Sequence, residues 1–294
     1  MPDGTLQRSY GKAFDRIACE YDRHRPSYPE QLVDLSCQIA GLGRGGQVLE
    51  IGCGSGQLTR SLLARDLHVT AVEPGAKLAA LAQQRFTGTG ALKLVNARFE
   101  DALLPRGRFR AVFSASAIHW VDPDVGWRRV ADALTADGTL ALIQYVGVHD
   151  PRSAEDQQAL FSAMTAIAPE AAADWPRYRE AQALIKGVHE RRGDISEAWA
   201  WLGDYELARE HVADLFEDVR IAAVPKLLEH TSDELNALLG TLSFWSRLSS
   251  EQRQAMESTN QALYERLGRP IRSSALACLV TARRRAAGAP SLPQ

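Results

Sequence analysis

Cysteine is scarce in this chain of 294 residues, which contains four. No C-x-x-C pair occurs among them (Cys19, Cys37, Cys53 and Cys278), so their spacing predicts neither a disulfide framework nor a structural zinc site. The sequence also lacks an uninterrupted apolar run of about 18 residues, the length that a membrane-spanning helix needs. No apolar signal segment follows Met1. We therefore expect a cytoplasmic protein that holds no metal and does not enter a membrane.

An excess of charge of one sign is equally absent. Lys and Arg number 34 and Asp and Glu 36, which gives a formal net charge of -2. Proteins that bind the nucleic-acid backbone usually carry a large basic excess, and the dense basic run here is confined to Arg283-Arg284-Arg285. Apolar residues at 45% and charged residues at 24% are typical of a globular protein. The composition therefore excludes fibrous and wholly disordered chains, and we expect no nucleic-acid partner.

Short apolar runs alternate with helical segments along the first half of the chain. Helical spacing of apolar residues is clear at Leu58, Leu62 and Leu63. The alternation predicts parallel strands joined by right-handed crossovers. The expected strands cover residues 47–51, 68–73, 91–95, 111–114 and 139–143.

The second half of the chain has a different pattern. Residues 148–218 contain no strand-like run and are mostly helical. Two further strands are expected at 219–230 and 274–282, with helices over 232–268 between them. The whole pattern predicts an α/β fold, with a doubly wound, mostly parallel seven-stranded sheet.

A cluster of glycines follows the first expected strand, as Gly52-Cys53-Gly54-Ser55-Gly56. Glycines between a strand and a helix allow a ligand to approach the backbone closely. The third glycine comes one residue earlier than in the dinucleotide pattern G-x-G-x-x-G, which places Gln57 where that pattern has glycine. Glu50, at the entry to the loop, would repel a diphosphate. The loop therefore favours a ligand without a diphosphate, although a simple tight turn is the plainer alternative.

An acidic residue, Glu73, ends the second expected strand, 21 positions after Gly52. A carboxylate about 20 residues beyond such a loop can accept hydrogen bonds from both ribose hydroxyls. A solvated strand end is the alternative for a single Glu. In combination, the loop and Glu73 predict a nucleoside with free ribose hydroxyls.

These segments resemble the motifs of class I S-adenosylmethionine-dependent methyltransferases. The resemblance is specific over residues 14–145 and looser over 219–284. The N-terminal segments are similar to those of a bacterial small-molecule branch, distantly like trans-aconitate-type methyltransferases. The segments that carry the resemblance are 14–18, 21–29, 48–57, 96–101 and 114–120, together with Glu73.

The resemblance implies a five-part organisation of the chain. The expected parts are an N-terminal helical lid (1–40), a Rossmann-like core that binds S-adenosylmethionine (41–147), a helical cap over the substrate, inserted after the fifth strand (148–218), closing strands and helices of the core (219–284) and a flexible tail (285–294).

The resemblance also implies a set of residues for the cofactor, which leaves as S-adenosylhomocysteine. One position departs from the family pattern, because Arg98 stands where the adenine segment often carries Asp. The expected cofactor-binding residues are Tyr21, Arg25, Tyr28, Glu50, Gly52, Cys53, Gly54, Gln57, Glu73, Pro74, Arg98, Phe99, Glu100, Ser114 and Ala115.

The expected catalytic residue is His119, which follows the fourth strand at the edge where parallel sheets open their binding crevice. It acts either as a general base or as an orienting group, and a structural histidine is the alternative. Glu20 is a second candidate, with a solvated helix face as its alternative. Trp120, His149, Phe244 and Trp245 are expected to bind substrate, and core packing or a solvated loop is the alternative for each.

The predicted function is methyl transfer by in-line displacement to a small molecule with an aromatic or apolar body, by a monomer or homodimer. Two alternatives remain from the sequence. One is a cofactor-binding protein of the same fold without methyl transfer. The other is a nicotinamide-dependent oxidoreductase, against which the early third glycine counts.

Overall fold

The computed structural model describes residue 15 and residues 17–172, 175 and 177–286; the side chains of Cys19 and Tyr21 lie outside the described part. The predicted roles of Tyr21, of the first fourteen residues and of most of the C-terminal tail therefore fall outside it as well. A seven-stranded sheet in the order β3-β2-β1-β4-β5-β7-β6 forms the centre of the fold. Five strands are parallel: β1 (Gln47–Ile51), β2 (His68–Val72), β3 (Leu92–Val95), β4 (Phe109–Ala115) and β5 (Leu134–Gly147).

The remaining two strands close the sheet in the antiparallel sense. β7 (Ile271–Arg284) pairs with β5 on one side and with β6 (Phe216–His230) on the other. This arrangement confirms the predicted doubly wound, mostly parallel seven-stranded sheet. Pro225 lies within β6, and the strand tolerates it because β6 is at the sheet edge, where a missing N–H breaks no inner ladder.

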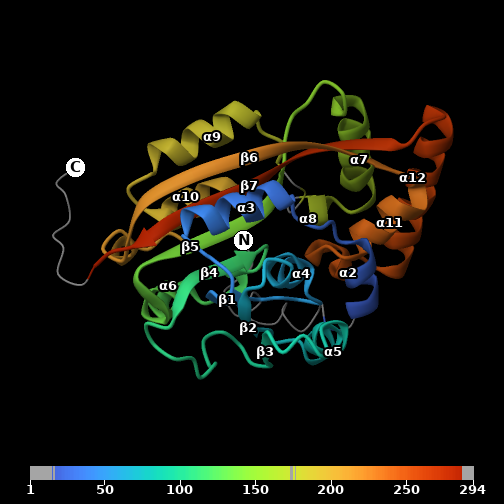
Figure 1. Cartoon of the computed structure of the whole chain (residues 1–294). Coiled ribbons are helices and arrows are strands. Elements are labelled where there is room, and N and C mark those ends of the chain that lie inside the picture. The colour runs from blue at the N-terminus through green and yellow to red at the C-terminus, as the bar shows by residue number, and fades with distance from the viewer. Residues whose placement is uncertain (1–14, 16, 173–174, 176, 287–294) are drawn as a thin grey trace.

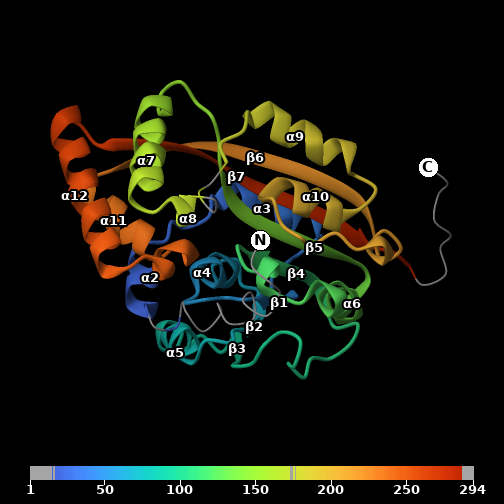
Figure 2. The same cartoon turned by 180° about the vertical axis from the view of Figure 1, so that it is seen from behind.

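Helices cover both faces of the sheet (Figures 1 and 2), which is why the central strands are apolar on both sides. One core contains residues of β1 with α3 (Glu30–Ile39), α4 (Gln57–Leu63) and α5 (Ala76–Arg85). The opposite core contains residues of β1 and β5 with α6 (Pro123–Ala133), α9 (Ala181–Glu190) and α10 (Ile195–Gly203). In Figure 1 α3 lies in front of the sheet and α10 behind it.

A third core lies at the far end of β6 and β7. It is formed by α7 (Ala154–Ile167), α8 (Pro169–Ala172), α11 (Ser232–Gly240), α12 (Ser250–Leu267) and the 3-10 helix Ser243–Arg247. The segment 148–218, expected as one cap, is thus divided: α7 and α8 join this third core, whereas α9 and α10 cover the sheet. The division follows from packing between distant segments, such as α7 with α12.

Two capping boxes divide the expected helical stretch 232–268. Thr231 caps α11 with Glu234, and Ser249 caps α12 with Gln252, so each helix begins at its own polar residue. In the N-terminal part, α2 (Ala18–His24) lies against α11. Among the helices of the described residues, none has both the length and the apolar character needed to cross a membrane.

Candidate functional site

The loop after β1 follows a path that only small residues permit. Gly52 has φ +68° and Gly56 has φ +96°, both in the left-handed region. A Cβ on Gly52 would lie 2.4 Å from the Cβ of Ala117, and one on Gly56 would lie 2.5 Å from Phe86 Cε2. The loop therefore fits closely against the segment that follows β4.

Glu73 ties this loop to the end of β2. Its side chain is 4% exposed, and its two carboxylate oxygens accept from the backbone N–H groups of Gly54 (2.9 Å) and Gly75 (2.8 Å). Burial raises the pKa of Glu73, and these two backbone hydrogen bonds oppose that rise. Each oxygen keeps a further lone pair, so the carboxylate can still accept from two ligand hydroxyls.

A second carboxylate, Asp15, lies close to Glu73. Its Oδ1 accepts from the backbone N–H groups of Lys77 (2.6 Å) and Leu78 (3.1 Å) at the start of α5. Its charge contributes to the raised pKa of Glu73. The sequence had not singled out Asp15 as a site residue, although it lies within the segment 14–18 that carries the family resemblance.

Glu50 is buried beneath the loop rather than lining it. It is 1% exposed, and its Oε2 accepts from Thr59 Oγ1 at 2.6 Å. Burial raises the pKa of this carboxyl to about 7, partly offset by the Thr59 hydroxyl. Glu50 therefore connects β1 to α4, and the structure shows it as a support of the loop.

The N-terminal segment is attached across the loop and the ends of two strands. Tyr28 donates its hydroxyl to Ser116 Oγ (3.1 Å) and stacks on Tyr145, with ring centroids 6.0 Å apart. The Tyr145 hydroxyl donates to Ser27 O at 2.7 Å. Tyr28 thus lies at the carboxyl edge of β4 and β5.

Two more contacts hold the same segment in place. Asp22 accepts from Ser55 Oγ at 2.7 Å and pairs with Arg85, whose guanidinium also donates to Ser55 O at 2.9 Å. Arg25 donates through Nη2 to Thr241 O at 2.9 Å. The segment therefore bridges the glycine loop and the end of α11.

The remaining predicted cofactor residues occupy several environments. Gln57, at the start of α4, has a buried Nε2 that finds no hydrogen-bond partner among the described residues. Cys53 is buried in the loop, and Ser114 Oγ donates to Ile51 O at 3.2 Å, which joins β4 to β1. Ala115 is half-buried at the end of β4, and Pro74 is exposed after Glu73.

In the segment expected beside the adenine (96–101), the side chains of Arg98, Phe99 and Glu100 contact other protein groups. The exposed Arg98 pairs with Glu100 at 2.7 Å, and Glu100 also accepts from the backbone N–H of Asp122 at 3.0 Å. The ring of Phe99 is buried in the core beneath the guanidinium of Arg129. The departure from the family's Asp at Arg98 is therefore accommodated by an ion pair.

His119 lies in the short helix Ile118–Trp120 that follows β4. Its ring stacks on Tyr205 (centroids 4.5 Å apart, 12° between planes) and is tilted against Trp120 at 4.9 Å. Desolvation, helped by the charge of Arg25, lowers the pKa of His119 to about 3. The imidazole is therefore neutral at physiological pH and a weak base, which favours the orienting role.

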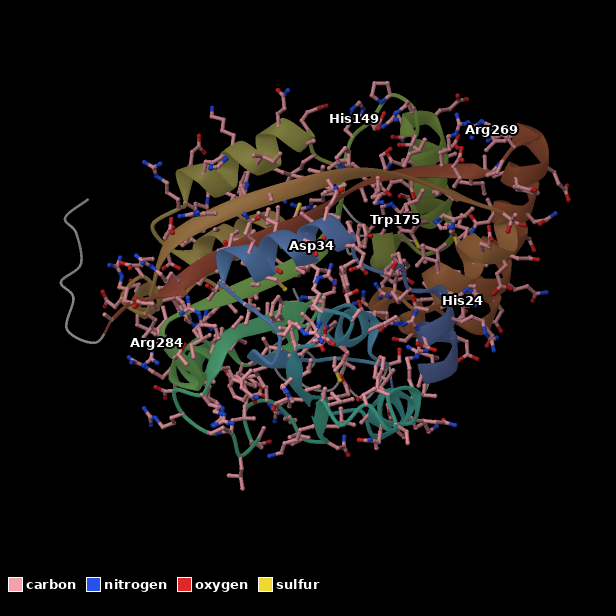
Figure 3. The ribbon with its side chains drawn as sticks, viewed as in Figure 1. His24, Asp34, His149, Trp175, Arg269 and Arg284 are labelled. Carbon is pink, nitrogen blue, oxygen red and sulfur yellow. The ribbon has the colours of Figure 1, made fainter. Side chains whose placement is uncertain are left out.

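The other predicted substrate residues lie apart from this group. His149 Nδ1 lies 3.1 Å from the Glu180 carboxylate, and its side chain is exposed in the loop between β5 and α7, where Figure 3 labels it. Phe244 and Trp245 are buried in the third core, where Phe244 packs on Trp175 at 5.6 Å. Glu20 is exposed on α2. Substrate binding by His149, Phe244 and Trp245 and a catalytic role of Glu20 stay predictions.

Two residues outside the predicted site set are linked to His119 by direct contacts. Tyr205 stacks on His119 and donates its hydroxyl to Gln144 Oε1 at 2.8 Å. Gln144 is a buried amide in the otherwise apolar centre of β5. An amide in a strand of Leu, Ile, Val and Ala is the sequence signal that points to it.

The described ranges contain no group of three or more His, Cys, Asp or Glu residues that could hold a metal ion.

Comparison with known proteins finds a methyltransferase domain within this chain. A family model described as a methyltransferase domain matches residues 49–142. An uncharacterised methyltransferase of Mycobacterium tuberculosis is 33% identical over 137 residues, which are 47% of this chain and 54% of that protein. A probable S-adenosylmethionine-dependent methyltransferase of Saccharomyces cerevisiae is 28% identical over 134 residues, 44% of this chain and 45% of that protein. The chain thus spans about half the length of these curated relatives.

Solved structures share the fold. A Haemonchus contortus phosphoethanolamine N-methyltransferase in complex with S-adenosylhomocysteine has a TM-score of 0.51 at 14% identity, over 97% of this chain and 61% of that one. The sheet order, the glycine loop and the strand-end carboxylate define a nucleoside-binding α/β protein of the doubly wound class. Together with the methyltransferase-domain match over residues 49–142, they support the resemblance to class I S-adenosylmethionine-dependent methyltransferases that the sequence predicted.

Proposed function

We propose that this chain transfers a methyl group from S-adenosylmethionine to a small molecule with an aromatic or apolar body. The observation that carries the proposal is the buried Glu73, whose carboxylate lies at the end of β2 and is bonded to the N–H groups of Gly54 and Gly75. Such a carboxylate suits a ribose with two free hydroxyls and opposes a phosphate at the same place.

The residues around the loop fit an adenosyl sulfonium. Glu73 is the acceptor for the ribose hydroxyls, and the buried Nε2 of Gln57 is a donor that has no hydrogen-bond partner within the described part of the chain. The close approach of Gly52 to Ala117 leaves no room for a side chain at that position. The buried carboxyl of Glu73 makes the neighbourhood acidic, which suits a cationic ligand better than a diphosphate.

S-adenosylmethionine supplies a methyl group already activated on a sulfonium, so positioning and exclusion of water account for much of the rate. His119 orients the acceptor at the end of β4, and its ring neighbours Trp120 and Tyr205 provide aromatic walls. Because the pKa of His119 is lowered to about 3, this imidazole is a weak base, and an acceptor that carries a proton has to lose it to another group or to water. Tyr28 and Arg25 hold the N-terminal segment over this edge.

The same proposal includes the organisation into lid, core and cap. It also includes a location in the cytoplasm, a role in secondary metabolism and a monomeric or dimeric state. The near balance of charge supports a small acceptor rather than a nucleic acid. The split of 148–218 supports a narrower cap, in which α9 and α10 cover the acceptor side.

A transfer assay with S-adenosylmethionine labelled in the methyl group tests the function directly. We expect label to move to members of a panel of small aromatic metabolites. Titrations of S-adenosylmethionine and NADH in parallel separate the alternatives. Binding of NADH alone would favour an oxidoreductase, and binding of S-adenosylmethionine without transfer to any panel member would favour a cofactor-binding protein without methyl transfer.

A further inference from the structure

Gln144 occupies a distinctive position in the sheet. In the parallel pairing of β4 and β5, Ala115 stands opposite Ile143, so Gln144 lies level with Ser116, where β4 ends. This is the edge at which parallel sheets open toward their ligands. The side chain is only 2% exposed, on the same sheet face as Leu142, which packs in the core with α10. An amide has therefore been buried beside the end of the strand that leads to His119.

The amide of Gln144 is only half satisfied. Its Oε1 accepts from the hydroxyl of Tyr205, whereas its Nε2 is buried without a hydrogen-bond partner among the described residues. Leaving a buried donor unpaired costs about 1–3 kcal/mol, so such a group is rare unless a ligand completes it. The structure thus holds a spare N–H donor at the sheet edge.

The local chain fixes Tyr205 as the link between Gln144 and His119. Gly203 ends α10, and Asp204 follows in the left-handed conformation (φ 56°), which turns the chain back on itself. A Cβ on Gly203 would lie 1.9 Å from Tyr205 Cε2, so the ring packs directly on the glycine. The same ring stacks on His119, and its hydroxyl holds the Gln144 amide. One aromatic ring therefore separates the amide from the imidazole.

Arg25 adds a positive charge to the surroundings of this group. The charge of Arg25 contributes to the lowered pKa of His119, and it opposes the rise in the pKa of Tyr205 that burial causes. Among the described residues, no carboxylate contributes to the pKa of either group. A protonated amine brought here would meet a like charge and an N–H donor, both of which repel it.

We propose that Gln144, held in place by Tyr205, determines the specificity of the acceptor site: its Nε2 donates to a carbonyl or phenolic oxygen of the acceptor, and the site excludes ammonium groups. This inference rests on the proposed function and narrows its substrate class. Gln144 is the group that touches the acceptor, whereas Tyr205 acts through it as a positioning residue.

Two probes of similar size test the inference, 4-hydroxyacetophenone and 4-methylbenzylamine. Their dissociation constants are measured by ligand-observed NMR on the full chain saturated with S-adenosylhomocysteine. We expect the hydroxyketone to bind about tenfold more tightly than the amine, the difference that one hydrogen bond and one repulsion provide. Gln144→Leu should remove this preference by weakening the hydroxyketone about tenfold.

Gln144→Glu is the sharper variant. It keeps an oxygen for the Tyr205 hydroxyl, but it replaces the N–H donor with a negative charge. We expect the order of the two probes to reverse, with the amine now bound more tightly. Tyr205→Phe should weaken the hydroxyketone about threefold, because the amide is then less well oriented. Tyr264→Phe, a half-buried tyrosine of α12, is the matched control and should change neither probe.

The same variants are titrated calorimetrically with S-adenosylhomocysteine, so that the two proposals fail separately. If the wild-type chain does not bind S-adenosylhomocysteine, the proposed function fails. If it binds, the inference is overturned when the two probes bind equally, when neither binds, or when Gln144→Glu leaves their order unchanged. Should Gln144→Leu fail to fold, the outcome with Gln144→Glu decides.

Discussion

The two sides of the carboxyl edge are built differently. On the proposed cofactor side, Glu73 accepts hydrogen bonds from the backbone N–H groups of Gly54 and Gly75, and Glu50 accepts one from Thr59. The two partners of each bond are at most 19 residues apart in the sequence. On the acceptor side, the Tyr205–Gln144 hydrogen bond joins residues 61 positions apart and leaves an amide nitrogen unpaired. The proposed cofactor side is therefore built mainly from contacts that are local in the sequence, whereas the proposed acceptor side depends on a long-range contact.

The largest effect on cofactor binding is expected from adding a side chain to the glycine loop. Gly52→Ala places a Cβ against Ala117 at a residue with φ +68°. Strain and crowding of about 3 kcal/mol should lower the affinity for S-adenosylhomocysteine about a hundredfold in calorimetric titrations. The control is Gly88→Ala, which has φ +84° with nothing within 4 Å of the new Cβ and lies away from the loop. Equal affinities for the two variants would contradict the close fit of Gly52.

Glu50 tests whether the cofactor side is a structural unit. Its pKa is raised from 4.5 to about 7 in the folded chain, so the protonated carboxyl contributes stability that is complete below pH 4.5 and is lost as the pH rises through 7. The loss amounts to about 3 kcal/mol. Glu50→Gln does not titrate, so we expect its free energy of unfolding to lack this decline. Urea denaturation of both proteins from pH 4.5 to 8 measures it, and parallel profiles would refute the assignment.

His119 is the corresponding test on the acceptor side. We expect His119→Ala to lower turnover about tenfold with little change in cofactor affinity, because the ring orients the acceptor and does not touch Glu73. The wild-type rate should show no inflection from this histidine near pH 6.5, since its pKa is lowered to about 3. His149→Ala, in its exposed ion pair, is the control and should match the wild type. An inflection near pH 6.5 that disappears in His119→Ala would instead identify a general base.

The smallest effect on binding is expected at Tyr28, which lies between the proposed cofactor and acceptor sides. Tyr28→Phe removes the hydrogen bond to Ser116 but leaves the stacking on Tyr145. A loss of about 0.5–1 kcal/mol should weaken S-adenosylhomocysteine binding about threefold. If the affinity stays unchanged while turnover falls, the N-terminal segment serves the acceptor side alone.

The same contrast explains what the sequence predicted. The parallel strands and the loop follow from local patterns, such as the apolar run at 47–51 and the glycines after it, and the structure confirms them. The role of Glu73 was inferred from its distance to Gly52, which is also a local signal. The division of 148–218 was not predicted, because it depends on whether each helix packs on the sheet or on α12.

Gln144 and Tyr205 were missed for the same reason. Tyr205 was one aromatic residue among several in a helical segment, and the turn that folds its ring onto Gly203 involves a left-handed Asp204. Gln144 had a visible signal, a lone amide in an apolar strand, but its partner lies on another element. Phe244 and Trp245 were assigned to substrate from their aromatic character, yet they fill the third core, where burial of apolar area is sufficient reason for them.

The most direct test of the account is a calorimetric titration of S-adenosylhomocysteine into the wild-type chain, Glu73→Gln and the exposed control Glu206→Gln. If Glu73 accepts the ribose hydroxyls, its neutral amide should bind about a hundredfold more weakly, because hydrogen bonds to a charged acceptor contribute about 1.5–3 kcal/mol each. Glu206→Gln should bind as the wild type does. Equal affinities for all three proteins, or no binding by any of them, would contradict the account.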